Sequence, residues 1–224
     1  MSLKKYITKK KVNHFTKGGI HVFVKDPLPS VINAESAIQD FIESVPRHLL
    51  KNIETIYIGK FKELEDRDIQ AMYENSSIFV TNKQTSEEDM LNDLIHETGH
   101  SVEEIYREFL YSDQKMESEF LRKRKDLWHE LKKENIETSL GYFLEPDYNK
   151  EFDEYLYKQI GYPMLSVLTA NLFYSPYAST SLREYFANGF EAFFMREDID
   201  RLKNISPVLF SKLATLLNDE ELKQ

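Results

Sequence analysis

The chain has 224 residues, a net charge of −9 and no cysteine. This length suffices for one domain with its own core, and the lack of cysteine excludes disulfides and zinc–thiolate sites. The acidic balance argues against nucleic acid as the main partner, because phosphate binding needs a basic surface. No 18-residue apolar run and no Sec-type signal occurs. We therefore expect no membrane span, and a protein that is cytoplasmic or is delivered without a Sec signal, to a host cell or in a virion.

Early segments of the chain have strand character. In residues 20–25, Ile20, Val22 and Val24 alternate with His21, Phe23 and Lys25, which predicts a strand with one buried face. The segments ETIYIGKF (54–61) and SSIFVTN (76–82) predict two further strands. Between the first two strands, the spacing of apolar residues predicts a helix that stops at Pro46. The segment 76–82 is interpreted as an edge to which an extended peptide adds as a strand.

From Ser86 onward the pattern is helical. A long amphipathic helix is expected over residues 86–111, with Leu94, Ile95, Val102 and Ile105 among its apolar positions. A second helix over 113–135 carries a charge run, which we interpret as a solvated face. An irregular, aromatic-rich connection over 136–152 precedes a mostly helical remainder. Strands early and helices late indicate an α+β fold, with a small N-terminal mixed sheet and a mainly helical C-terminal part.

The stretch LIHETGHSVEE (94–104) lies inside the first long helix. His96 and His100 are four residues apart, so on a helix they share one face and can hold one Zn²⁺ ion. Glu97 lies beside them and is expected to act as the general base that takes a proton from a water molecule on the metal. The alternative is a surface helix with two incidental histidines.

A catalytic zinc site needs a third protein ligand. His129 lies on the charged helix and is interpreted as a solvated or packing residue, so a later carboxylate is expected. Glu184 and Glu191 are seven residues apart on one helix face, and both are candidates. Glu184 has an alternative role, since Ser181 and Glu184 form a capping-box pattern. The side chains of Glu103 and Glu104 lie on the wrong turn to reach the metal.

HETGH, followed later by Tyr177 and by EYFANGF (184–190), resembles the catalytic domain of anthrax lethal factor and the clostridial Pro-Pro endopeptidases. The resemblance implies a zincin-like fold and a zinc-dependent endopeptidase that acts on peptides or proteins. It implies His96, His100 and Glu184 as zinc ligands, Glu97 as the general base and Tyr177 as the phenol over the substrate carbonyl. One domain is then expected over residues 1–224: an α/β part at about 12–112, a helical insertion at about 113–165 and a C-terminal helical part at about 166–220.

The chain departs from the pattern of that family at Asn188, where the family usually has an acidic residue four positions after the ligand Glu. On a helix that side chain can orient the ring of the first zinc histidine, and a neutral amide polarises the imidazole less than a carboxylate does. The competing hypothesis is therefore a zincin-fold binding or structural module, for example a phage virion component, with weak or no peptidase activity. The sequence leaves the oligomeric state open.

Overall fold

The computed structural model describes residues 13–196 and 198–218, and the chain divides into two compact units, residues 1–102 and 103–224. The division falls inside helix α4 (Glu87–Tyr111), so each unit contains part of this helix. Within α4 the backbone is helical except at Tyr106, where the helix kinks. The fold is α+β, as predicted; the expectation of a single domain stays a prediction.

The first unit is built on a five-stranded mixed sheet with the strand order β1-β2-β3-β5-β4. β2 pairs with β3 and β3 with β5 in parallel, whereas the outer strands β1 and β4 pair antiparallel with their neighbours. The predicted strands are β2, β3 and β5, while β1 and β4 were missed. The strand bounds are β1 Asn13–Lys17, β2 Ile20–Val24, β3 Thr55–Gly59, β4 Ala71–Glu74 and β5 Ser77–Thr81.

The prediction that residues 76–82 form an edge is wrong. β5 lies inside the sheet and is paired on both sides, with β3 and with β4. The outer strand at this end is β4, which follows the short helix α3 (Lys62–Arg67). The sequence around β4 is polar and only four residues of it are paired, so its periodicity was too short to recognise.

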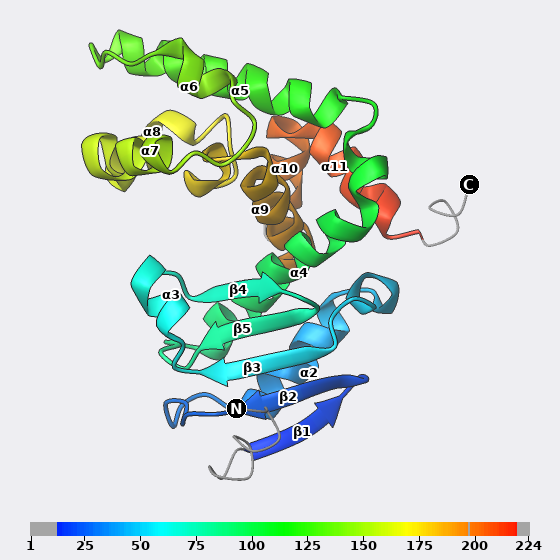
Figure 1. Ribbon diagram of the computed structural model, residues 1–224. Coiled ribbons are helices and arrows are strands. Elements are labelled where there is room, and N and C mark those ends of the chain that lie inside the picture. Colours follow the sequence, from blue (N-terminus) through cyan, green and yellow to red (C-terminus); the bar gives the residue numbers. More distant parts are fainter. Residues whose placement is uncertain (1–12, 197, 219–224) are drawn as a thin grey trace. The chain divides into compact units, whose positions relative to one another are not determined.

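One face of the sheet carries the core of the first unit. Val22, Ile56 and Ile78 come from three neighbouring strands and are completely buried. Helix α2 (Ala34–Ser44) and the first part of α4 lie on this side of the sheet (Figure 1). The predicted helix is thus confirmed as α2. Its N-cap is Asn33, whose side chain accepts hydrogen bonds from two backbone N–H groups of the first turn.

The other face of the sheet carries a row of aromatic rings. His14, Phe23, Tyr57 and Phe79 are cross-strand partners in register, one from each of β1, β2, β3 and β5. Neighbouring rings stack with centroids 4.4, 5.4 and 5.2 Å apart. Cross-strand aromatic pairs stabilise a sheet and oppose slippage of its strands. The row therefore fixes the register of the sheet that supports α4.

The second unit is helical. The long helix α5 (Lys115–Lys133) is followed by short helices and turns in place of the irregular connection expected over 136–152. The further bounds are α6 Leu140–Leu144, α7 Lys150–Glu154, η2 Tyr155–Ile160, α8 Tyr162–Thr169, η3 Tyr177–Ser179, α9 Leu182–Met195, α10 Ile199–Ile205 and α11 Pro207–Leu216, while η1 (Arg47–Leu50) belongs to the first unit.

Three charged residues of α5 are buried, so the prediction of a solvated charge run is wrong for this part of the helix. Glu119, Lys123 and Arg124 are 4%, 3% and 1% exposed. Each has polar partners, as buried charges require. Lys123 Nζ donates to the carbonyl of Leu172 and to the hydroxyl of Ser206, at 2.8 and 2.7 Å. The guanidinium of Arg124 donates to the carbonyl oxygens of Tyr142 within α6 and of Glu145 directly after it.

Glu119 connects α5 to two later helices. Its carboxylate accepts from the phenol of Tyr185 on α9 at 2.8 Å. It also accepts from the backbone N–H groups of Val208 and Leu209 in the first turn of α11, at 2.9 and 3.1 Å. A carboxylate at the start of a helix satisfies free N–H groups and opposes the positive end of the helix dipole. This contact therefore fixes α9 and α11 against α5.

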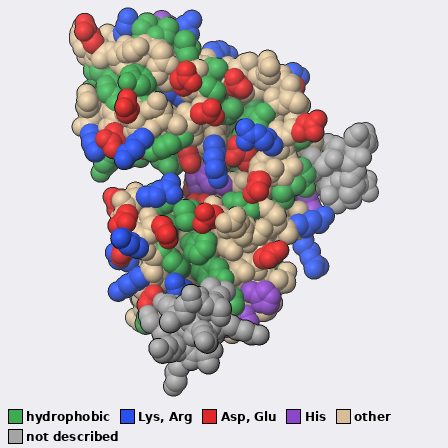
Figure 2. Space-filling model, in the orientation of Figure 1, with side chains coloured by type: hydrophobic (Ala, Val, Ile, Leu, Met, Phe, Trp, Pro, Cys, Tyr) green, Lys and Arg blue, Asp and Glu red, His purple; other side chains and the backbone are tan. Residues whose placement is uncertain are grey.

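The surface carries charges of both signs. On the face drawn in Figure 2, acidic and basic side chains are interspersed, so the negative net charge is not gathered into one patch there. Within the described ranges, none of the helices combines the length and the apolar character needed to cross a membrane.

Lys123 makes the stability of the protein depend on pH. Burial lowers the pKa of its ammonium group to about 8 from 10.5. Between these values the unfolded chain binds more protons than the folded one, so the free energy of unfolding rises with pH across that window. Urea unfolding at pH 7, 9 and 10.5 should show the wild type gaining up to about 3 kcal/mol relative to Lys123→Met. Lys125→Met, at an exposed position of α5, is the control. If the difference in unfolding free energy between the wild type and Lys123→Met did not change with pH, the lowered pKa of Lys123 would be contradicted.

Candidate metal centre

Helix α4 is anchored by its cap and by its apolar face. The hydroxyl of Ser86 accepts from the backbone N–H of Asp89 at 3.0 Å, which confirms the predicted start of the helix. Leu94, Ile95 and Val102 are completely buried, as expected. Ile105, which follows the same helical spacing, is 46% exposed and lies outside the buried stripe. The buried stripe sets the direction in which the other face of the helix points.

His96 and His100 lie one helical turn apart on α4. Their ring centroids are 5.1 Å apart and the ring planes are inclined by 83°. His100 is 7% exposed and His96 is half-buried. Two imidazoles at this spacing can direct one ring nitrogen each at a common point, which is how a helix supplies two zinc ligands.

Glu97 is held by the backbone of β4. Its Oε2 atom accepts a hydrogen bond of 2.7 Å from the backbone N–H of Tyr73, and its side chain is buried. This donor belongs to the outer strand of the sheet, which sequence reasoning did not find. The bond fixes the orientation of the carboxylate relative to the helix turn that carries both histidines.

Glu184 lies in the first turn of α9. The hydroxyl of the N-cap residue Ser181 accepts from the backbone N–H of Glu184 at 3.1 Å. The cap thus uses the main chain of Glu184, and a carboxylate that binds metal is compatible with it.

The neighbouring Arg183 pairs with Glu103, with Nε and Oε2 3.6 Å apart. Burial raises the pKa of Glu103, and the phenol of Tyr111 donates to the same carboxyl group at 2.7 Å.

His96, His100 and Glu184 form a potential metal-binding group, in which one ligand atom from each lies within 4.8 Å of the other two. Bonds of about 2.05 Å at tetrahedral angles would place ligand atoms about 3.3 Å apart. Side-chain rotation can close a difference of this size. The donor set of two imidazoles and one carboxylate is also the one found in catalytic zinc sites of peptidases, so these residues fit a zinc ion.

Other candidates are not part of this group. Glu191, which the sequence left open as the third ligand, does not join the metal-binding group found among the described residues. His129 is exposed and its ring contacts that of Trp128, with centroids 4.9 Å apart. The carboxyl group of Glu103 is engaged by Arg183 and Tyr111. Of the two carboxylates weighed from the sequence, the structure favours Glu184.

Tyr177 begins the short turn η3 (Tyr177–Ser179), five residues before α9. Burial, followed by the negative charge of Glu184 and then that of Asp153, raises the pKa of its phenol well above the ordinary value. The phenol therefore stays protonated at neutral pH and can donate a hydrogen bond. The effect of Asp153 indicates that α7, inside the predicted insertion, lies in the neighbourhood of Tyr177.

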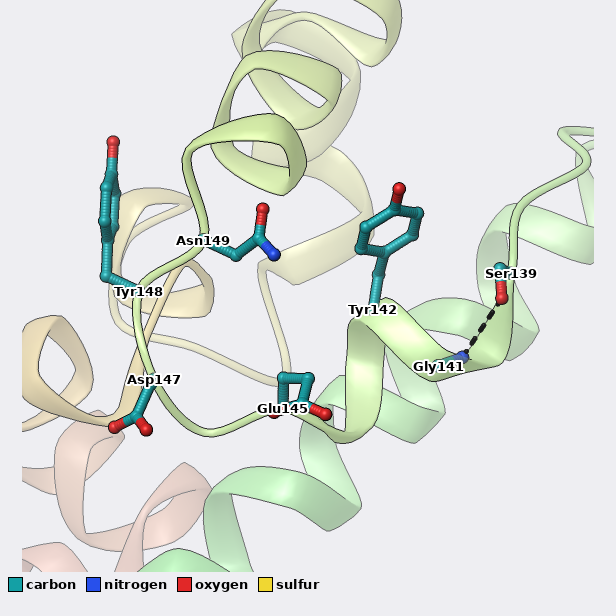
Figure 3. A pocket seen from close by; sticks show the side chains of 7 residues that line it. All are labelled: Ser139, Gly141, Tyr142, Glu145, Asp147, Tyr148 and Asn149. Atoms are coloured by element: carbon teal, nitrogen blue, oxygen red, sulfur yellow. Dashed lines mark hydrogen bonds between the residues drawn. The ribbon is translucent and has the colours of Figure 1, made fainter.

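A pocket of ≈ 520 Å³ lies in the segment between α5 and α7. In Figure 3 the rings of Tyr142 and Tyr148 stand on either side of Asn149. Tyr148 donates its phenol proton to Asp153 at 2.9 Å, and Asp153 in turn affects the pKa of Tyr177. The lining residues are Ser139, Gly141, Tyr142, Glu145, Asp147, Tyr148 and Asn149.

Comparisons of the chain with protein-family models, with curated proteins and with solved structures gave no match.

The arrangement predicts one zinc ion per chain. Isothermal titration of the metal-free protein with Zn²⁺ should give a stoichiometry of one, and Glu184→Gln and His96→Gln should each weaken binding by more than about 100-fold, because each removes a ligand. Glu191→Gln, two helical turns further along α9, is the matched control and should bind like the wild type. Equal weakening by the Glu184 and Glu191 variants would contradict the ligand assignment.

Proposed function

We propose that the chain is a zinc-dependent endopeptidase with a zincin-like site. The observation that carries the proposal is the convergence of the ligand atoms of His96, His100 and Glu184, with Glu97 on the same helix turn as the histidines. The mixed sheet with an antiparallel outer strand ahead of α4 supports a zincin-like fold. The zinc, when bound, would supply Lewis-acid polarisation of a water molecule and of the scissile carbonyl.

Glu97 is the proposed general base. Its Oε2 atom is held by the N–H group of Tyr73, so the carboxylate is oriented before substrate arrives. In the proposed reaction Glu97 takes a proton from the attacking water as the oxygen bonds to the carbonyl carbon. It then gives this proton to the amide nitrogen as the carbon–nitrogen bond breaks, which leaves a free amine and a carboxylic acid.

Tyr177 supplies the hydrogen bond that the carbonyl oxygen needs as negative charge develops on it. A phenol is protonated at neutral pH, so it has a proton to donate in this role. Loss of one such donor typically costs about 10²–10³ in rate. Because Asp153 and Tyr148 both act on the pKa of this phenol, we infer that the segment that carries them contributes to substrate selection.

The test is hydrolysis of a peptide library by zinc-loaded protein, read by mass spectrometry of the products. Glu97→Gln should lower the rate of cleavage by at least about 10²-fold, since it removes the base and keeps the size of the side chain. Glu108→Gln is a matched control, because Glu108 is an exposed residue of the same helix. Cleavage that survives in Glu97→Gln would show that another protein is responsible.

The alternative is a zincin-fold binding or structural module, and the same hydrolysis experiment distinguishes it from an endopeptidase. Such a module would bind one equivalent of zinc and hydrolyse none of the peptides. Protein with His96 and His100 intact that takes up no zinc would contradict both hypotheses.

A further inference from the structure

Three consecutive hydrogen bonds connect the turn of Tyr177 to the helix of Glu184. The backbone N–H of Ala178 donates to Ser175 Oγ at 3.3 Å, and the Ser175 hydroxyl donates to Asn188 Oδ1. Asn188 Nδ2 then donates to the backbone carbonyl of Glu184 at 2.9 Å. We call these contacts the Asn188 relay. It starts at the residue after the proposed oxyanion donor and ends on the main chain of the proposed zinc ligand.

The chemistry of the side chain at position 188 matches both of its partners. An amide accepts through its oxygen and donates through its nitrogen, and Asn188 does both while only 8% exposed. An ionised carboxylate only accepts hydrogen bonds, so an acidic residue here would leave the bond to the Glu184 carbonyl unmade. These two hydrogen bonds give a physical reason for Asn188 at the position where the family that the chain resembles usually has an acidic residue.

Other polar contacts of the turn are local. Ser179 Oγ donates to the carbonyl of Pro176 and Thr180 Oγ1 to the carbonyl of Tyr177, at 2.7 and 2.8 Å. These bonds close the turn on itself. The bond between Ser175 and Asn188 differs from them, because it joins the segment before the turn to a side chain of α9.

We propose that Asn188 and Ser175 are positioning residues that hold the turn of Tyr177 on helix α9, and thereby aim the Tyr177 phenol at the substrate carbonyl. This inference rests on the endopeptidase proposed above. A donor misplaced by about 1 Å can cost about 10²-fold in rate, so hydrogen bonds that only position the donor are enough to control turnover. In this proposal neither Ser175 nor Asn188 contacts substrate or metal.

The kinetic test uses Ser175→Ala and Asn188→Ala in two backgrounds. In the wild-type background each should lower kcat by about 10-fold or more, with KM and zinc affinity within about twofold of the wild type. The double variant should lose no more than the worse single one, since both break the same relay. In a Tyr177→Phe background neither substitution should lower kcat further. A full additional loss in that background, or weaker zinc binding, would overturn the proposal.

Asn188→Asp separates the relay from the alternative in which this position orients a zinc histidine. The relay predicts a lower kcat for this variant, because the carboxylate cannot donate to the Glu184 carbonyl. A tighter zinc affinity and a higher kcat would show that the side chain acts on the histidine, and would overturn the relay.

Hydrogen exchange tests the relay without any activity. Amide hydrogens of residues 177–180 should exchange at least about 10-fold faster in Ser175→Ala and Asn188→Ala than in the wild type, because the relay holds this turn closed. Unchanged exchange would overturn the relay even in an active enzyme. A protein that exchanges as expected and cleaves no peptide would instead refute the endopeptidase, so the two failures are distinguishable.

Discussion

The packing of α4 determines the rest of the site. Its buried stripe of Leu94, Ile95 and Val102 fixes the rotation of the helix about its own axis. Because side chains four residues apart share a face, this rotation sets one direction for His96 and His100 together. The bond from the N–H group of Tyr73 to Glu97 then ties the same helix turn to β4. A rotation of α4 by one residue would misdirect all three side chains at once.

The parts predicted from the sequence are those that depend on local periodicity. The alternation in β2 and the helical spacing in α4 were sufficient because each pattern is carried by residues that are near neighbours in the chain. The strands β1 and β4 were missed, and β5 was taken for an edge, because strand order depends on pairing between distant segments. His96, Glu97 and His100 were predicted from one short motif, and Glu184 and Tyr177 from the resemblance to a family. The Tyr73 contact to Glu97 depends on β4 and was not foreseeable.

The burial of charged residues in helix α5 was not predictable from the composition of the helix. Its charges read as a solvated face, but Glu119, Lys123 and Arg124 are buried and each has hydrogen-bond partners far along the chain. The same type of long-range polar contact holds Asn188 and Ser175. Whether a polar side chain is solvated or buried depends on which segments fold against it. Residues that are near neighbours in the sequence do not show which distant segments these are.

X-ray absorption at the zinc edge of the stoichiometrically loaded protein would show whether His96, His100 and Glu184 bind one zinc ion. We expect nitrogen and oxygen ligands at about 2.0–2.1 Å, with outer-shell scattering from two imidazoles that falls to one in His96→Gln. A spectrum without imidazole scattering, or one that is identical in His96→Gln, would contradict this ligand set.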